Sequence, residues 1–263
     1  MIGRLRGLVA EVGEEGLPDE IRPLVHELNL LFGRVRQAFD AQKNFVAEAA
    51  HELRSPLAAL RLQVQGLQRA RDDATRQLAV ERLLAGIDRA TRLVEQLLTL
   101  ARQQAQPSAG EPPQPVALAA LAAQVVAEAA PAAALKHIDL GLGDSDATQV
   151  QGHAEPLRIL LTNLVDNALK YGRTGGLVGL RCVMQDERVL IEVCDDGPGI
   201  PPAVREQVFE RFYRHAGSQA SGSGLGLSIA REIVRSHRGH IAIDDGPDNA
   251  EGGRGTCVRV TLP

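Results

Sequence analysis

The sequence predicts a multidomain α + α/β protein, in which an antiparallel two-helix hairpin is followed by an α/β sandwich. Two observations predict this order. Apolar residues recur at helical spacing through roughly the first hundred residues, whereas residues 116–263 alternate helical with strand-like patterns. At 263 residues the chain is long enough for two domains that each bury a core.

The first long helix is predicted from about Asp19 to Ala70. Its apolar residues alternate steps of three and four, which is typical of a coiled coil or bundle helix. After Ala49 the steps become four and four, a stutter that locally unwinds a supercoil. The apolar positions before the stutter are Ile21, Leu24, Leu28, Leu31, Val35, Ala38, Phe45 and Ala49.

A histidine lies opposite this apolar stripe. His51 is two residues from both Ala49 and Leu53, so a rotation of about 100° per residue turns it toward solvent. Pro56 cannot donate an N–H to the carbonyl of Glu52, and we expect the helix to bend there. His51 is therefore a candidate phosphate acceptor. The alternative is one surface histidine among seven beside an incidental kink.

A second helix and a linker follow. Asp72 or Asp73 can cap this helix, and its three-four spacing runs from Val80 to Leu97. Two such helices form a hairpin whose exposed apolar stripes are covered when two copies pair into a four-helix bundle, so we expect a homodimer. Gln103 to Pro115, rich in Gln and Pro, is the predicted linker.

The remaining chain is predicted to alternate helices and strands. A tight turn at Asp186-Glu187 joins two of the strands, and Gly239 reads as a helix cap rather than part of a metal site with His237 and His240. The expected helices are 117–134, 155–171 and a third ending near 237. The expected strands are 137–142, 148–152, 176–185, 188–195, 240–244 and 256–262.

Composition excludes several classes of protein. The net charge of −4 comes without a long basic run, which argues against a nucleic-acid-binding surface. No uninterrupted run of about 18 apolar residues is present, and we expect the chain as given to be soluble. Cys182, Cys194 and Cys257 lack metal-ligand or CxxC spacing, so we expect buried free thiols rather than a disulfide or a zinc site.

Three polar motifs occur in the second half. Asn163, Asn167 and Lys170 share one face of a helix. Asp195-Asp-Gly197-Pro-Gly199 ends a strand-like run, and Gly222-Ser-Gly224-Leu225-Gly226-Leu227 opens another helix, where glycines let N–H groups approach phosphate. Each motif alone is weakly specific, because glycine-rich turns are common. Their order and spacing together are much more specific.

With His51-Glu-Leu-Arg-Ser55-Pro56-Leu57 upstream, this order resembles the cytoplasmic portion of a bacterial sensor histidine kinase over nearly the whole chain. It is most similar to the group that includes the enteric quorum- and adrenergic-signal sensor, judged by that box and by residues 87–100. The resemblance implies an ATP-binding (Bergerat) sandwich in residues 116–263, a dimerisation and phosphotransfer domain in 41–104 and a linker in 105–115. Residues 1–40 are similar to the end of a HAMP relay module, with a generic coiled-coil lead-in as the alternative.

The resemblance also implies roles. Asn163 and Asn167 would hold Mg²⁺, Asp195 would accept the adenine amino group, and His51 would attack the γ-phosphate of ATP while Glu52 accepts a proton. Ser55 stands where relatives carry Thr or Asn for dephosphorylating the partner, the receiver domain of a response regulator, and the full-length parent would be anchored in the inner membrane. The other nucleotide contacts would be Lys170, Tyr171, Gly197, Gly199, Arg214, Gly222, Gly224, Leu225, Gly226 and Leu227.

Two alternative functions, and the roles of two phenylalanines, remain open at this point. A gating ATPase of the same nucleotide fold would hydrolyse ATP without phosphorylating His51, and a dimeric scaffold would have lost turnover. In the predicted lid, residues 201–223, Phe209 and Phe212 would either pack beneath the loop or serve the nucleotide, or do both.

Overall fold

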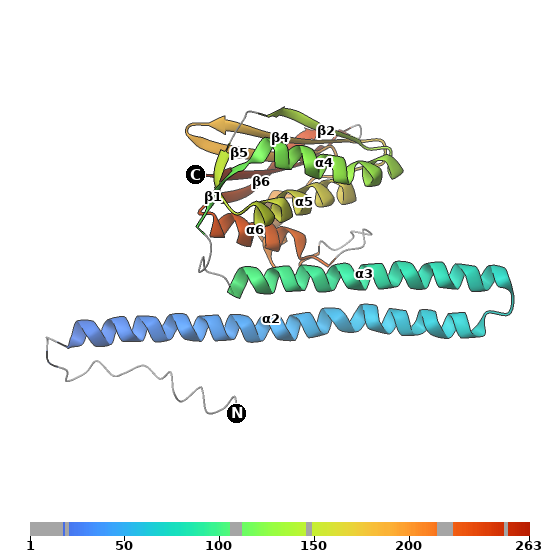
Figure 1. Ribbon diagram of the computed structural model, residues 1–263, viewed down its shortest axis with the longest axis horizontal. Coiled ribbons are helices and arrows are strands. Elements are labelled where there is room, and N and C mark those ends of the chain that lie inside the picture. The colour runs from blue at the N-terminus through green and yellow to red at the C-terminus, as the bar shows by residue number, and fades with distance from the viewer. Residues whose placement is uncertain (1–17, 19–20, 106–111, 146–148, 215–222, 250–251) are drawn as a thin grey trace. The chain divides into compact units, whose positions relative to one another are not determined.

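A computed structural model of the chain describes residues 18, 21–105, 112–145, 149–214, 223–249 and 252–263 (Figure 1). The chain divides between Thr91 and Arg92 into two compact units. Most of the predicted HAMP-like start before Ile21, the middle of the predicted linker and Gly222 lie outside the described residues.

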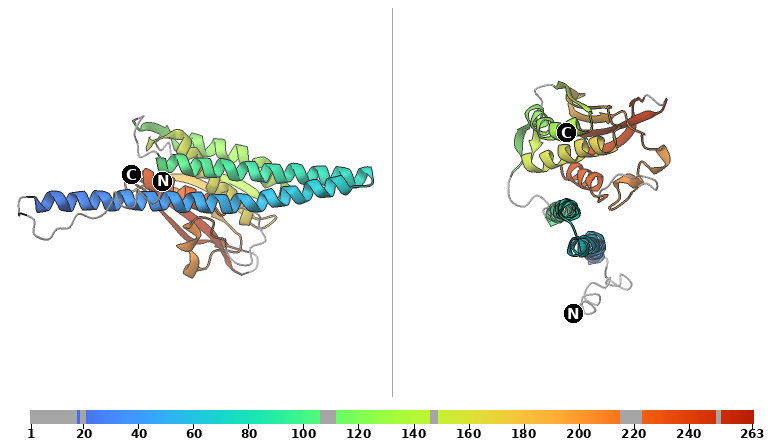
Figure 2. Two further views of the ribbon diagram at one scale, coloured as in Figure 1. Left: turned by 90° about the horizontal axis from the view of Figure 1, so that it is seen from below. Right: turned by 90° about the vertical axis from the view of Figure 1, so that its right-hand side faces the viewer.

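A long helical hairpin forms the first unit, and the end of its second helix, from Arg92 on, belongs to the second unit. Helix α2 spans Arg22–Arg69 and helix α3 spans Asp73–Ala105, so the predicted end near Ala70 is confirmed. Asp72 caps α3, because its Oδ1 accepts the N–H of Thr75 at 2.7 Å and its Oδ2 accepts the Thr75 hydroxyl at 2.9 Å. Figure 2 shows the two helices side by side.

Close packing within the hairpin depends on a glycine. A Cβ added to Gly86 of α3 would lie 2.5 Å from Gln63 Oε1 and 2.8 Å from Leu60 Cδ2 of α2. Helix α2 has no buried residue, whereas α3 buries Leu93, Leu97 and Leu100 toward its end. Large apolar side chains are therefore exposed along the predicted stripe, among them Leu24, Leu28, Leu31, Leu57, Val64 and Ile87.

The second unit is built on a five-stranded sheet of order β2-β4-β5-β7-β6. β2 pairs with β4 in parallel, and the other neighbours are antiparallel. The strands are β2 Asp139–Ser145, β4 Leu177–Gln185, β5 Arg188–Asp195, β6 His240–Asp248 and β7 Arg254–Leu262. All five correspond to predicted strands.

A small second sheet pairs β1 (Gln114–Ala117) with β3 (Gln149–Gly152). Strand β1 was not predicted, because residues 114–117 were assigned to the linker and to the start of a helix. Only Val116 of this strand is buried. A strand of four residues with one buried side chain shows too little alternation of apolar and polar residues to be recognised from sequence. The pairing with β3, more than thirty residues later in the chain, makes it a strand.

Helices α4 (Leu118–Leu135), α5 (Ala154–Tyr171) and α6 (Gly226–Ser236) lie on one face of the large sheet (Figure 1). Strand residues alternate, so every second side chain points into the core beneath these helices. The fully buried core includes Leu157, Leu160, Leu161 and Leu164 of α5, Ile229 and Ile233 of α6, and Leu180, Ile191 and Leu262 of the sheet.

Helix α4 bears on the expectation that the chain has no uninterrupted apolar run of about 18 residues. Among the described helices it meets the length and hydropathy of a membrane span, although it contains Gln124 and Glu128. The helix contacts α5 and β2, and Leu118, Ala122 and Val125 are buried there. Its apolar composition comes largely from alanine, which suits a helix packed on a sheet.

The predicted turn between β4 and β5 and the predicted cap at the end of α6 are both present. The β4–β5 turn places Asp186 and Glu187 at φ of 49° and 61°, as in the two-residue hairpin turn that matches strand twist. Helix α6 ends in a Schellman motif, in which Gly239 N–H donates to Val234 O at 2.9 Å. Gly239 thus takes part in the cap as predicted, while the left-handed residue is Arg238, at φ of 58°.

The expectation of three free thiols was wrong for two of them. Cys194 of β5 and Cys257 of β7 form a disulfide, because the antiparallel register places them directly opposite each other. The sequence could not show this pairing across a separation of 63 residues. Cys182 is a buried free thiol, as expected, and burial raises its pKa to about 11.

Candidate active site

The predicted phosphate acceptor lies on α2. His51 is exposed, whereas Ala49 and Leu53 on either side of it are half-buried, so the predicted orientation of the histidine is confirmed. Glu52 is half-buried, and Ser55, one turn after His51, is exposed. The helix continues through Pro56. The imidazole is therefore accessible to a nucleotide or to a partner protein.

Two amides of α5 meet the start of α6. Asn163 Nδ2 donates to Ile159 O at 2.8 Å, which leaves its Oδ1 available as an acceptor. A Cβ added to Gly226 would lie 3.1 Å from Asn163 Oδ1 and 3.6 Å from Asn167 Oδ1. The two predicted amide ligands and the first residue of α6 are thus brought together. An alanine at position 226 would crowd the Asn163 oxygen.

This donor set fits a magnesium ion. Mg²⁺ prefers oxygen ligands and keeps several waters when it binds to nucleotide phosphates. Among the described residues, no group of three or more His, Cys, Asp or Glu could hold a metal ion. The amide oxygens of Asn163 and Asn167 are neutral oxygen donors of the kind that Mg²⁺ accepts.

The end of α5 carries Lys170 and Tyr171. Lys170 Nζ donates to the Tyr171 hydroxyl at 2.9 Å and lies 4.5 Å from the centre of its ring. The Tyr171 side chain remains 39% exposed. In this structure the Lys170 ammonium is thus engaged with tyrosine, so a phosphate contact requires a change of rotamer.

Asp195 is the last residue of β5 and only 6% exposed. Its Oδ1 accepts the N–H of Gly197 at 2.9 Å. Burial raises the pKa of Asp195 to about 6, opposed by hydrogen bonds from the N–H groups of Gly197 and Thr256 and reinforced by the neighbouring charge of Asp196. The buried carboxylate is held in one direction by these hydrogen bonds, and such an acceptor can bind an amino group.

Asp196 is a residue that sequence reasoning left without a role. It is 2% exposed, and it accepts hydrogen bonds from Arg173 Nε at 2.8 Å and from Leu177 N–H at 2.9 Å. These bonds tie the loop after α5 to the end of β5. The double aspartate was visible in the sequence, but nothing local indicated that the second carboxylate binds Arg173.

Gly197 and Gly199 are required by the protein's own backbone. A Cβ at Gly197 would lie 2.9 Å from Tyr171 O, and a Cβ at Gly199, where φ is 74°, would lie 2.3 Å from Arg254 O. This close approach is to the protein's own backbone, and the predicted approach of these glycines to a nucleotide base stays a prediction. The atoms that crowd these glycines belong to α5 and β7, so the motif positions Asp195 as well as leaving room for a base.

The glycine-rich start of α6 is similarly crowded. Gly224 has φ of 72°, and a Cβ there would lie 2.8 Å from Tyr213 O. Leu225 is fully buried, which makes it an anchor rather than a lining residue, and Leu227 is half-buried. The first N–H groups of a helix lack intrahelical partners, so this helix start can bind phosphate oxygens.

The predicted lid contains two short 3₁₀ helices, η1 Pro202–Val204 and η2 Gln207–Phe209. Phe209 is buried, and the Arg231 guanidinium lies 5.7 Å from its ring centre. Phe212, at φ of 59°, donates its N–H to Gly224 O at 3.0 Å. Both phenylalanines therefore have packing or positioning roles, while Arg214 is exposed.

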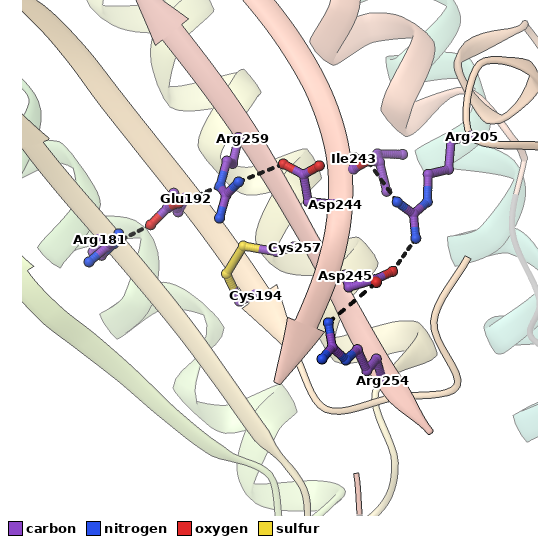
Figure 3. A network of polar contacts seen from close by, with 10 residues as sticks. All are labelled: Arg181, Glu192, Cys194, Arg205, Ile243, Asp244, Asp245, Arg254, Cys257 and Arg259. Carbon is purple, nitrogen blue, oxygen red and sulfur yellow. Dashed lines mark hydrogen bonds and ion pairs between the residues drawn. A yellow bond between two sulfur atoms is a disulfide. The ribbon is translucent and has the colours of Figure 1, made fainter. Parts of the chain in front are cut away.

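Arg205 anchors the beginning of this loop and was also missed from sequence. Its Nε donates to Ile200 O at 3.0 Å, and its Nη2 pairs with Asp245 of β6 (Figure 3). Asp245 additionally faces Arg254 of β7, with Nη1 and Oδ2 at 3.6 Å. The lid thus begins from a fixed point on the sheet.

These features define a class of protein in two parts. One part is a helical hairpin that exposes a histidine. The other is an α/β sandwich in which two amides of α5 meet the glycine-rich start of α6, with a buried carboxylate at the end of β5. A protein that combines these two parts belongs to the class that transfers a phosphoryl group from a nucleotide to a histidine.

Comparison with known proteins identifies the family. Residues 41–106 match the His Kinase A (phospho-acceptor) domain, and residues 152–263 match the histidine kinase-, DNA gyrase B-, and HSP90-like ATPase. The chain belongs to the sensor histidine kinases. The ATPase match implies ATP as the nucleotide of the sandwich.

Named relatives agree with this assignment. Sensor protein kinase PmrB of Pseudomonas aeruginosa is 38% identical over 253 residues, which cover 96% of this chain and 52% of that protein. Sensor protein QseC of Salmonella typhi is 39% identical over 248 residues, which cover 93% of this chain and 53% of that protein. The chain therefore spans about half the length of these relatives.

Solved structures show the same folds. The mycobacterial sensor histidine kinase MprB matches with a TM-score of 0.52 and 32% identity, over 57% of this chain and 97% of that chain. The histidine kinase ThkA in complex with the response regulator protein TrrA matches with a TM-score of 0.69 and 21% identity, over 87% of this chain and 63% of that chain. The second likeness concerns the fold alone.

Proposed function

We propose that this chain is a sensor kinase core that uses Mg-ATP to phosphorylate His51 and then transfers the phosphoryl group to an aspartate of a response regulator. The observation that carries the proposal is that one chain combines an exposed His51, followed directly by Glu52 on α2, with an ATPase-type site around Asn163, Asn167 and Asp195. A gating ATPase, which hydrolyses ATP without phosphorylating the protein, does not require His51 and Glu52.

Nucleotide binding would use the buried carboxylate and the helix start. Asp195 accepts a hydrogen bond from the adenine amino group, and Tyr171, partly exposed at the end of α5, flanks the base. The N–H groups at the start of α6 face the phosphates, and Lys170 turns from Tyr171 toward them. Asn163 and Asn167 would hold Mg²⁺, which would neutralise charge on the phosphates. Arg214 supplies a further cation from the lid.

Phosphoryl transfer depends mainly on positioning and on charge neutralisation. A neutral ring nitrogen of His51 attacks the γ-phosphorus as the bond to the bridging oxygen breaks and ADP leaves. Glu52, on the next residue, accepts the proton from the other ring nitrogen. An exposed imidazole suits this task, because the nucleotide and later the regulator must both reach it.

The partners follow from the surface of the hairpin. The exposed apolar stripe on α2 and α3 would be covered by a second copy, giving a four-helix bundle. A receiver domain would dock on the face around His51, and the ThkA structure, solved in complex with a response regulator protein, supports a partner of this kind. The Ser55 hydroxyl, one turn from His51, would hold a water for regulator dephosphorylation. Because ATP and receiver domains are found in the cytoplasm, we expect this part of the chain to lie there.

The test is a labelling experiment with γ-labelled ATP and Mg²⁺. Wild type should acquire label that is lost in acid and stable in alkali, because phosphohistidine is acid-labile. His51→Gln and Asn167→Ala should acquire none. His26→Gln is the matched control, because His26 is another exposed histidine of α2, and it should label like wild type.

Other outcomes would replace the proposal. ATP hydrolysis that persists in His51→Gln, without labelled protein in wild type, would favour a gating ATPase. Nucleotide binding with neither label nor hydrolysis would indicate a dimeric scaffold. Label that survives acid would place the phosphate on a residue other than histidine.

A further inference from the structure

The two cysteines of the Cys194–Cys257 pair lie at the nucleotide end of the sheet. They are cross-strand partners on β5 and β7, with Cα atoms 4.0 Å apart, close to the spacing of a non-hydrogen-bonded pair. The next pair toward that end of the sheet is Asp195 and Thr256. The disulfide therefore lies one residue from the carboxylate proposed to bind adenine.

The sulfur atoms are on the face of the sheet that points away from the helices. Side chains alternate along a strand, so Asp195 points toward the helix-covered face and Cys194 toward the other. Figure 3 shows the disulfide on this outer face, with helices behind the strands. A reagent that approaches from the outer side does not have to enter the core.

Access to the two sulfur atoms differs. Cys194 is half-buried, whereas Cys257 is 3% exposed. The cross-strand neighbour of Cys194 on β4 is Gly179, which in turn pairs with Gly141 of β2. A Cβ added to either glycine would meet nothing within 4 Å, so open space adjoins Cys194 on the β4 side.

The outer face around the pair is polar. Arg259 Nε lies 2.6 Å from Glu192 Oε1, and Arg259 Nη1 lies 2.7 Å from Asp244 Oδ2 (Figure 3). Arg181 pairs with the other oxygen of Glu192. This row of charges spans β4, β5, β7 and β6, and its two arginine side chains, Arg181 and Arg259, are 52% and 47% exposed. A charged low-molecular-weight thiol compound can therefore approach it.

We propose that Cys194 and Cys257 form a thiol–disulfide exchange site for low-molecular-weight disulfides, and that its oxidation tightens nucleotide binding at Asp195. The second half of this inference rests on the proposed function. Cytosolic disulfides in ordinary bacteria are mostly transient and redox-sensing rather than structural, which fits a pair on an open face.

The exchange balances in two steps. The Cys194 thiolate attacks a disulfide RSSR, forming a mixed disulfide and releasing one RS⁻. The Cys257 thiolate then attacks the Cys194 sulfur, closing the cross-strand bond and releasing a second RS⁻. The protein loses two protons and two electrons, and RSSR gains both to become two RSH. Exposure assigns the first attack to Cys194.

The coupling follows from the tight packing at this end of the sheet. The Asp195 carboxylate receives hydrogen bonds from Gly197 and from Thr256, the residue before Cys257. A Cβ on Gly246 would lie 2.7 Å from Asp195 O, so β6 also closes on the same point. Joining β5 to β7 beside this residue fixes the carboxylate in place before the nucleotide arrives, and preorganisation increases affinity.

The first measurement counts thiols. The full chain would be reduced, exposed to oxidised glutathione, and then alkylated with N-ethylmaleimide in denaturant, so that buried thiols also react, before mass analysis. The chain contains three cysteines, so we expect three alkylated thiols after reduction and one, Cys182, after oxidation. Cys194→Ala and Cys257→Ala should each prevent the intramolecular disulfide. Cys182→Ala is the matched control and should still form it.

The second measurement is the dissociation constant for a fluorescent ATP analogue in both redox states. We expect oxidation to tighten binding by about fivefold, the lower end of usual coupling strengths, in wild type and in Cys182→Ala. Cys257→Ala should bind equally under both conditions. Three thiols remaining after glutathione treatment would overturn the exchange site, and equal affinities would overturn the coupling. Absence of nucleotide binding in both states would instead refute the proposed function, while the thiol count still decides the exchange site.

Discussion

The Asp195 carboxylate accepts the N–H of Gly197 at 2.9 Å while burial raises the pKa of the same carboxyl group to about 6. Ionised carboxylates accept hydrogen bonds more strongly than neutral ones. We therefore predict that affinity for ATP falls as the pH is lowered through about 6, the pKa of this group. Titration of a fluorescent ATP analogue from about pH 5 to about pH 8 measures this, the range in which such a group titrates.

A stability measurement separates this effect from acid unfolding. The folded-state pKa of Asp195 is above the ordinary value of 3.8, so the folded chain holds this proton more tightly than the unfolded chain. Its contribution to stability is present below pH 3.8 and is lost as the pH rises through about 6. Affinity and this stability contribution thus change in opposite directions. Asp195→Asn should bind weakly without the pH dependence, and an unchanged pH profile in that variant would contradict the assignment.

The crowding at Gly199 leads to a second prediction. An alanine there would combine φ of 74° with a Cβ 2.3 Å from Arg254 O. Gly199→Ala should lower the free energy of unfolding by about 1 to 3 kcal/mol, the usual cost of a strained backbone site. Denaturant titration measures this. Gly141→Ala is the control, because its Cβ meets nothing within 4 Å, and it should leave stability unchanged or slightly higher.

Local patterns predicted the helices and most strands because each depends on neighbouring residues. The end of α2 and the limits of β5 follow from periodicity and from turn residues. Strand β1 and the Cys194–Cys257 disulfide depend on partners far along the chain, so no local pattern indicates them. The register of β5 with β7 decides the second of these.

The same distinction holds within the site. Motif residues such as Asn163 and Asp195 were identified because their spacing is regular and the family resemblance gave them roles. Asp196 and Arg205 support the site through ion pairs, and their partners, Arg173 and Asp245, come from other parts of the chain. A residue whose task is to join two elements carries no sequence signal until the elements are placed.

The Asp196–Arg173 pair gives a third prediction. Arg173→Met would leave a carboxylate that is 2% exposed with only the Leu177 N–H as its partner. Because Arg173 itself is partly exposed, water replaces some of the lost interaction, and we expect a loss of about 1 to 3 kcal/mol in unfolding free energy.

A matched surface pair provides the comparison for this variant. Arg76 Nη1 lies 3.1 Å from Asp73 Oδ1, and both side chains are exposed. Exposed pairs contribute little to stability, so Arg76→Met should leave the denaturant midpoint unchanged. Equal effects of the two substitutions would show that the Asp196 pair has no special structural role. Nucleotide affinity should fall only in Arg173→Met, because Asp196 adjoins Asp195.

The last prediction concerns His237 at the end of α6. Its Nδ1 donates to Ile233 O at 2.8 Å, so the ring is the Nδ1–H tautomer, and its Nε2 accepts His153 N–H at 3.4 Å. Burial lowers the pKa of His237 below 6.5, with the hydrogen bond to Ile233 opposing and His153 adding to the shift. Protonation would place a second donor against the His153 N–H.

The unfolded chain therefore binds this proton more readily than the folded chain. Stability from His237 is full above its ordinary pKa of 6.5 and is lost as the pH falls below that value. We predict that the difference in denaturant midpoint between wild type and His237→Gln shrinks as the pH falls from about 7.5 to about 5.5, across the titration of histidine. A constant difference between wild type and His237→Gln would mean that the folded and unfolded states hold this proton equally.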